Sequence, residues 1–141
     1  AGTLTGISGS TDLIKVGLVR KIVSRGISIG EIGVTGKARI IKNNLDISLI
    51  CPGEILFVPK ELMKNIPLSK NIAGIVTNQN VNDVYALFNK NNKKISTICN
   101  LEKMDNNQIS NGDLITLQLN EGVIYMGQIE DDDAIDKYKY V

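Results

Sequence analysis

Two apolar runs decide the fold: Gly53-Glu54-Ile55-Leu56-Phe57-Val58 and Ile72-Ala73-Gly74-Ile75-Val76-Thr77. Each run has the length of a strand and is apolar at successive positions, which is typical of a strand buried within a sheet. Pro52-Gly53 forms a turn before the first run, and Pro59 ends it because proline lacks the N–H that a sheet ladder needs. Residues 61–66 predict one or two helical turns. We therefore expect two buried strands joined by a partly helical connection.

Further strands and one long helix accompany this pair. Glycines at 26, 30, 33 and 36 favour short β segments and turns over helix. Residues 46–50 fit a helical turn or an extended piece, and Asn120-Glu121-Gly122 fits a hairpin loop. The strands expected in addition are 34–42, 95–99, 113–119 and 123–127. The order predicts a β-rich α/β domain with one main helix.

The main helix is expected over residues 82–92. Its start carries Asn82 and Asp83, either of which can cap it, because their side-chain oxygens accept hydrogen bonds from free backbone N–H groups. Val84, Leu87 and Phe88 recur at the spacing of one helix face. We expect this face to be buried.

Composition excludes several kinds of function. The 141 residues include no histidine, so Ser-His and Cys-His catalytic pairs and histidine-ligated metals are absent. A net charge of +1 and 4% aromatic residues supply neither the basic surface nor the stacking side chains typical of nucleic-acid binding. No apolar run has the length of a membrane span. We expect no catalytic residue, no metal site, and neither nucleic acid nor membrane as a partner.

The two cysteines predict a reducing environment. Cys51 and Cys99 both lie in apolar runs, so we expect buried, reduced thiols and no disulfide. The acidic run Glu130-Asp131-Asp132-Asp133 is expected to be part of a solvated tail, because adjacent carboxylates point in different directions and do not converge on a metal ion.

Four segments together resemble the swivelling phosphohistidine domain of phosphoenolpyruvate-utilising enzymes. The segments, in chain order, are Gly53–Val58, Ala73–Thr77, Asn111–Leu117 and Gly122–Gly127. Each segment is weakly specific by itself, and the ordered set is the specific feature. The resemblance covers about residues 26–128 and implies a ββα swivelling fold.

A second resemblance lies at the N-terminus. Ala1-Gly2-Thr3 and the segment Gly9–Val16 are similar to the last strand and phosphate-effector loop of the pyruvate kinase C-terminal domain. Ser24–Gly30, followed by Gly36–Ile40, resembles the junction to an extra domain in bacterial-type pyruvate kinases. The chain is thus expected to be a fragment. The implied divisions are an end of the preceding domain at 1–16, a linker at 17–25, the swivelling domain at 26–128 and an acidic polar tail at 129–141.

The segment after Thr77 departs from the phosphohistidine family. A gapless alignment places the family's phosphorylated histidine at Tyr85, its serine at Val84 and its glycine pair at Asn80-Val81. A phenol with a pKa of about 10 and no neighbouring base is a poor phosphoryl acceptor. We therefore expect Tyr85 to be a packing or interface aromatic at the start of a helix, in a domain that lacks its transfer group.

The resemblance implies a non-catalytic domain of pyruvate kinase with a structural and regulatory role in subunit contacts and effector response. The parent would transfer a phosphoryl group from phosphoenolpyruvate to ADP in glycolysis, using magnesium and potassium. It would act as a homotetramer in the cytoplasm or a plastid-like organelle. A sugar-phosphate or nucleotide effector would bind a loop whose amides and hydroxyls suit a phosphate. The loop residues are Gly6, Ser8, Gly9, Ser10 and Thr11.

Two other functions remain open from the sequence. One is a degenerate phosphotransfer domain of a dikinase or a sugar phosphotransferase system enzyme, with Tyr85 or an unrecognised group as carrier. The other is a free-standing interaction module. Labelling with phosphoenolpyruvate tests the first, and the mass of the native protein tests the second.

Overall fold

The computed structural model describes residues 21–104 and 108–127, and the described residues from Ile22 onward belong to one compact unit. Within the described residues, eight strands form one mixed sheet in the order β2-β9-β8-β4-β5-β6-β7-β3. The strands are β2 (Ile22–Arg25), β3 (Ile27–Ile29), β4 (Val34–Ile40), β5 (Glu54–Val58), β6 (Ile72–Thr77), β7 (Thr97–Cys99), β8 (Leu114–Gln118) and β9 (Val123–Met126). The helices are α1 (Asn44–Ile47), the 3₁₀ helix η2 (Lys60–Asn65) and α2 (Val81–Lys90).

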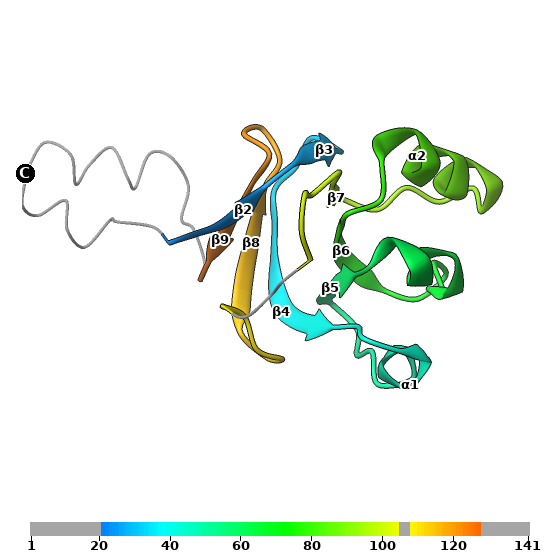
Figure 1. Ribbon diagram of the computed structural model, residues 1–141, viewed down its shortest axis with the longest axis horizontal. Coiled ribbons are helices and arrows are strands. Elements are labelled where there is room, and N and C mark those ends of the chain that lie inside the picture. Colours follow the sequence, from blue (N-terminus) through cyan, green and yellow to red (C-terminus); the bar gives the residue numbers. More distant parts are fainter. Residues whose placement is uncertain (1–20, 105–107, 128–141) are drawn as a thin grey trace, which may run out of the picture. The chain divides into compact units, whose positions relative to one another are not determined.

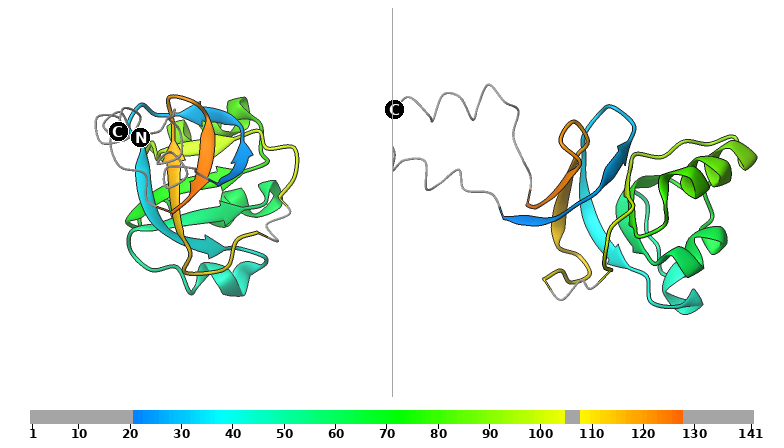
Figure 2. Two further views of the ribbon diagram at one scale, coloured as in Figure 1. Left: turned by 90° about the vertical axis from the view of Figure 1, so that its left-hand side faces the viewer. Right: turned by 45° about the horizontal axis from the view of Figure 1, so that its top comes forward.

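Strand β4 divides the sheet into two parts. Its residues Val34–Lys37 pair antiparallel with β8, and its residues Ala38–Ile40 pair parallel with β5. The antiparallel part thus contains β2, β9 and β8, whereas β5, β6 and β7 continue in parallel from β4. The helices cover one face of the parallel part, and the antiparallel part lies on its other face (Figures 1 and 2). This arrangement confirms a β-rich α/β domain with one main helix.

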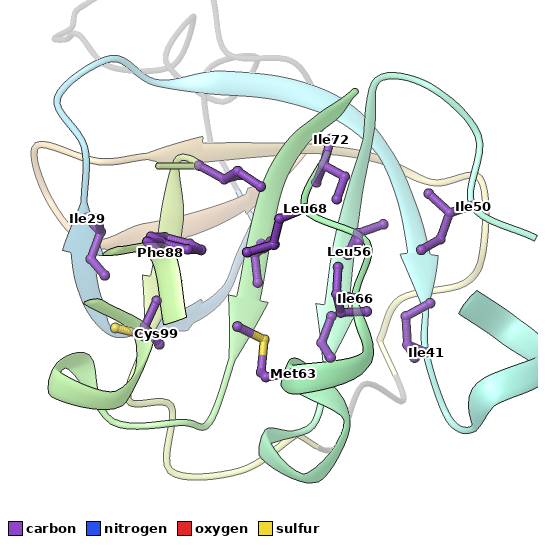
Figure 3. Close-up of a cluster of buried hydrophobic side chains, with 14 residues drawn as sticks. Ile29, Ile41, Ile50, Leu56, Met63, Ile66, Leu68, Ile72, Phe88 and Cys99 are labelled. Atoms are coloured by element: carbon purple, nitrogen blue, oxygen red, sulfur yellow. The ribbon is translucent and has the colours of Figure 1, made fainter. Parts of the chain in front are cut away.

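Two hydrophobic cores lie on either side of the parallel strands. All five residues of β5 are buried, because Ile55 and Phe57 pack in one core and Leu56 and Val58 in the other. The first core also contains Ile115, Leu117 and Ile124 from the antiparallel strands. The second core is shown in Figure 3 and includes Met63, Val84 and Phe88 beneath the helices. The expected burial of Val84 and Phe88 is confirmed, and Leu87 packs partly buried against the same core.

The two end strands of the sheet, β2 and β3, are consecutive in the chain and are separated only by Gly26. The sheet therefore curls until its ends meet at this glycine. The Gly26 N–H donates to the carbonyl oxygen of Gly122 at 2.9 Å. A side chain at Gly26 would collide with the carbonyl oxygen of Cys99, so this close approach requires glycine.

The sequence predicts a linker at residues 17–25. Residues 22–25 of this segment form strand β2. Residues 17–20 lie outside the described residues. The strand pairs with Val123, Ile124 and Tyr125, about a hundred residues later. Local alternation does not reveal it, because Ile22 is 41% exposed and a register irregularity follows it.

Other boundaries differ less. Strands β5 and β6 fall within the two runs that open the sequence analysis, and β7 begins at Thr97, two residues later than expected. Residues 44–47 form α1, so a helical turn begins at Asn44 and Leu49 and Ile50 follow it. Gly122 has the positive φ expected of the hairpin loop between β8 and β9. Among the described residues, no helix is long and apolar enough to cross a membrane.

Candidate functional site

The start of α2 is the position at which the resembled family carries its phosphohistidine. Asn80 caps this helix, because its Oδ1 accepts from the Asp83 N–H at 2.9 Å and its Nδ2 donates to Asp83 Oδ2 at 2.9 Å. The prediction that Asn82 or Asp83 provides the cap is therefore wrong. Asn80 has an extended backbone conformation and directly precedes Val81, the first residue of α2. The Asp83 carboxylate thus lies in the first turn of α2, beside the free N–H groups that would otherwise attract a phosphoryl anion.

Tyr85 lies in the second turn of α2 and is 41% exposed. The free backbone N–H groups of a helix belong to its first turn, so the Tyr85 phenol does not share the helix N-terminus. Within residues 21–104 and 108–127, the phenol makes no hydrogen bond. Tyr85 borders a shallow hollow of about 330 Å³. The remaining lining residues are Phe88, Asn89, Asn92, Lys93 and Lys94, which include no carboxylate or other base for the phenol proton.

The segment between β6 and α2 is tied to its neighbours by hydrogen bonds. The side chain of Thr77 accepts from the Gln79 N–H at 3.1 Å, and that of Asn78 accepts from the Lys60 N–H at 2.8 Å. The Asn100 N–H, which follows β7, donates to the Gln79 carbonyl at 2.8 Å. Ligands of α/β sheets commonly bind where parallel strands end. Here the uncharged side chains of Thr77 and Asn78 accept hydrogen bonds from backbone groups, whereas the buried Gln79 Oε1 has no hydrogen-bond partner among the described residues.

A charged pair lies elsewhere in the described domain, between the half-buried Arg39 and the buried Glu54. Arg39 Nε and Nη2 donate to the two carboxylate oxygens of Glu54 at 3.0 and 2.9 Å, and the Cys51 N–H donates to Glu54 Oε1 at 2.8 Å. The side chains of Arg39 and Glu54 are 19% and 8% exposed. Burial alone would raise the pKa of Glu54, but the hydrogen bonds from Arg39 and Cys51 outweigh burial and lower the pKa. The hydrogen bond to Glu54 likewise raises the pKa of Arg39. This is a satisfied structural pair that joins β4 to β5.

A groove of about 720 Å³ lies at the ends of β4 and β5, and no sequence motif indicated it. Lys42, Asp46, Ser110 and Asn111 are its polar lining residues, and two of their side chains are used in local structure. Asp46 accepts from the Lys42 N–H at 2.7 Å, and Asn111 accepts from the Ile40 N–H at 2.6 Å. The side-chain oxygens of Asp46 and Asn111 that make these bonds are therefore not free to orient a small ligand in this groove.

The two cysteines differ in environment. Cys99 is buried in the core beneath α2, and burial raises the pKa of its thiol to about 11. Cys51 is exposed, so the prediction that both thiols are buried is wrong. The apolar run around Cys51 does not lie along a buried strand. It follows α1, where Leu49 is exposed, Ile50 is buried and Cys51 is exposed again. Both cysteines are free.

Two other segments that the sequence singles out are the expected effector loop and the acidic run. The expected effector loop, Gly6, Ser8, Gly9, Ser10 and Thr11, lies outside the described residues, as does the acidic run 130–133. In the ranges 21–104 and 108–127, no three His, Cys, Asp or Glu side chains gather where they could hold a metal ion.

Comparison with known proteins gives matches to pyruvate kinases. The chain is 34% identical to pyruvate kinase 2 of Synechocystis sp. over 129 residues, which cover 92% of this chain and 22% of the relative. It is 28% identical to the pyruvate kinase of Staphylococcus saprophyticus and 26% identical to that of Staphylococcus haemolyticus, each over 90% of this chain and 22% of the relative. No protein-family model matches the chain. The chain is therefore homologous to a region that makes up about a fifth of these pyruvate kinases.

Proposed function

We propose that this chain is the C-terminal region of a bacterial-type pyruvate kinase and that residues 22–127 form a non-catalytic appended domain. Similarity over 129 residues that span only 22% of each relative carries the proposal, because it matches this chain to a part of those enzymes. Residues 1–16 would be the end of the preceding effector-binding domain. The transfer of phosphoryl from phosphoenolpyruvate to ADP would then take place on residues outside this chain.

Three features of the domain support a non-catalytic role. The chain has no histidine, and Tyr85 occupies the position that aligns with the family's phosphohistidine. The Tyr85 phenol has no hydrogen-bonded base among the described residues. After β6, the side chains of Thr77 and Asn78 are uncharged and accept hydrogen bonds from backbone N–H groups. A phosphoryl acceptor requires an activated nucleophile, and none of these groups is activated.

The parent enzyme would require magnesium and potassium, as the resemblance to pyruvate kinases implies. The described residues do not fit such ions, since no cluster of carboxylates or thiols converges among them. Both ions would be held by the catalytic part of the parent. The domain would instead contribute to contacts within a homotetramer and to the response to a sugar-phosphate or nucleotide effector.

Removal of the domain from the parent enzyme tests this role. The deletion should begin at Ile22, because a deletion from Gly26 leaves β2 without its partner β9. We expect the truncated enzyme to retain turnover at saturating substrate, to dissociate at higher protein concentration than the intact tetramer, and to lose part of its activation by effector. Analytical ultracentrifugation and effector titration measure these properties. Unchanged tetramer stability together with unchanged activation would contradict the proposed role.

A further inference from the structure

Helix α1 is apolar on the side that faces the solvent. Leu45 lies in the helix and is 76% exposed, and Leu49 follows about one turn later and is 57% exposed. The side that faces the domain is apolar as well, because Ile47 packs against the core beneath the helices and Ile50 is part of it. The segment 45–50 thus carries apolar side chains both toward the core and toward the solvent. In the described domain, α1 is buried on one side only.

The outward position of the two leucines is fixed by hydrogen bonds. Asn43 caps α1 by accepting from the Asp46 N–H at 3.2 Å, and Asp46 in turn accepts from the Asn43 N–H. The side chain of Asn65, at the end of η2, donates to the Asn44 side chain at 3.0 Å. A flexible turn could fold its leucines inward, but a turn capped and braced in this way holds them outside. Figure 1 shows α1 beyond the end of β4, at the border of the helical layer.

The chemistry of this surface fits an uncharged, apolar protein surface. Among residues 43–49, the one charged side chain is Asp46, and its carboxylate is engaged with the N–H groups of Lys42 and Asn43. Two leucines cover far less than the roughly 800 Å² that each partner of a stable, freely formed complex buries. A surface of this size can hold a partner that is already tethered, because covalent linkage supplies a high effective concentration. The relatives contain more than three quarters of their length outside the matched region.

We propose that Leu45 and Leu49 dock α1 onto the part of the same polypeptide that precedes this chain. The inference rests on the proposed function, since it assumes that the chain is one region of a pyruvate kinase. It assigns α1 as the surface through which the appended domain contacts the remainder of its own subunit. The contact would cover both leucines and leave the cap residues at its border.

Photo-crosslinking in the full-length parent enzyme tests the docking. Leu45→p-benzoylphenylalanine places a crosslinker at the centre of the surface. Ile32→p-benzoylphenylalanine is the matched control, because Ile32 is an isoleucine with 78% exposure in the turn between β3 and β4. We expect the position-45 crosslink to leave the chain at the mass of a single subunit on a denaturing gel. Mass spectrometry should then identify the captured peptide upstream of residue 1, and position 32 should give no such peptide.

A second substitution shows whether the leucines hold the contact. Leu49→Asp should lower the yield of the position-45 crosslink by about tenfold, the factor that corresponds to loss of one buried leucine contact. Ile32→Asp should leave the yield unchanged. Circular dichroism checks that each variant is folded, and Leu49→Asn replaces the aspartate if the charge prevents folding. An unchanged yield in a folded variant would overturn the assignment of Leu49 to the contact.

Three crosslinking results would overturn the proposal: a product of doubled mass, which indicates a second subunit; capture of a peptide within residues 1–141; and no capture beyond that of position 32. These results are independent of the deletion from Ile22. If the deletion alters tetramer stability but position 45 captures nothing upstream, the domain has its proposed role through another surface. If position 45 captures an upstream peptide but the deletion has no effect, the docking holds and the regulatory role fails.

Discussion

Helices α1 and α2 are attached to the same sheet by different means. α2 is ten residues long and buries Val84 and Phe88 in the core, while its outer positions are largely polar. α1 is four residues long and buries none of its own residues fully. It is fixed by its capping box, by the Asn44–Asn65 hydrogen bond, and by the Cys51 N–H that binds Glu54 shortly after the helix.

The two helices differ in whether their solvent side is polar. α2 has one apolar face and one polar face, which is the pattern of a helix at a protein surface. α1 packs Ile47 against the core and is braced by hydrogen bonds, whereas Leu45 in the helix and Leu49 after it are exposed. The two helices should therefore respond differently to substitution. α2 should depend on its buried side chains, and the segment around α1 should depend on hydrogen bonds and charge.

The largest expected effect is at the buried face of α2. Phe88→Ala should lower the free energy of unfolding by about 3–5 kcal/mol, because it removes a phenyl ring that is 2% exposed and leaves a cavity. Tyr85→Ala on the same helix should cost less than about 0.5 kcal/mol, because Tyr85 is on the exposed side. Urea unfolding of the 141-residue chain measures both. A loss below about 1 kcal/mol for Phe88→Ala would contradict the described packing of α2.

The second largest loss of stability is expected at the Arg39–Glu54 pair, which binds the Cys51 N–H after α1. Glu54→Gln keeps the shape of the side chain but leaves the Arg39 guanidinium without a counter-ion. We expect a loss of about 3 kcal/mol, at the lower end for a broken buried pair, because Arg39 retains some exposure. Glu61→Gln, at an exposed glutamate of η2, is the control and should stay within about 0.5 kcal/mol of the parent chain. Equal effects of the two substitutions would show that the pair contributes no stability.

The same pair predicts how stability depends on pH. The pKa of Glu54 is lowered in the folded chain, so the folded state binds a proton there less readily than the unfolded state. The contribution of Glu54 is therefore complete above the unfolded pKa of about 4.3 and is lost as the pH falls through the folded value. Unfolding followed from pH 6 to pH 3 should show a smaller decline in Glu54→Gln than in the parent chain. A steeper decline in the variant would contradict the lowered pKa.

The N-cap of α2 should contribute less to the free energy of unfolding than Phe88 or the Arg39–Glu54 pair. Asn80→Ala removes the acceptor for the Asp83 N–H and should cost about 1 kcal/mol. Asn82→Ala is the matched control, because Asn82 lies in the first turn and does not provide the cap. It should change the free energy of unfolding by less than about 0.5 kcal/mol. A larger loss of stability from Asn82→Ala than from Asn80→Ala would support Asn82 as the cap, as the sequence predicted.

The smallest effect is expected at Tyr85. Tyr85→Phe removes a hydroxyl that has no hydrogen-bond partner among the described residues, so stability should change by less than about 0.5 kcal/mol. Incubation of the full-length enzyme with labelled phosphoenolpyruvate should leave residues 80–90 unlabelled in both forms. A label on the parent that Tyr85→Phe removes would instead support a phosphotransfer function.

The sequence predicted those strands and helices whose apolar side chains lie in a core along the whole element. Strands β5 and β6 and the buried face of α2 follow from local apolar patterns, since each packs in a core over its whole length. Strand β2 could not be found in this way, because its pairing with β9 depends on residues far along the chain. The exposure of Cys51 was missed for a related reason. Its apolar neighbours predicted burial, but the chain turns after α1 and alternates between core and solvent.

At the candidate site, sequence pattern indicated residue types but not their contacts. The absence of histidine follows directly from the sequence, and the alignment of Tyr85 with the phosphohistidine position is what the resemblance implies. Asn80, Asn82 and Asp83 can each cap a helix by residue type, and only the structure shows that the Asp83 N–H donates to Asn80 Oδ1. The pairing of Arg39 with Glu54 likewise requires knowledge that β4 and β5 are neighbours. Such contacts are set by tertiary structure and leave no periodic signal.

The closure at Gly26 has a mechanical consequence for the way the chain enters the domain. Tension applied at Ile22 would load the hydrogen bonds of β2 to β9 and, through Gly26, those of β3 to β7. Both parts of the sheet would share that load in shear, so neither could be peeled from the other by a pull on this strand. A torque transmitted along the chain would turn the two parts together. Residues 22–29 thus act as a fastening between the two parts of the sheet.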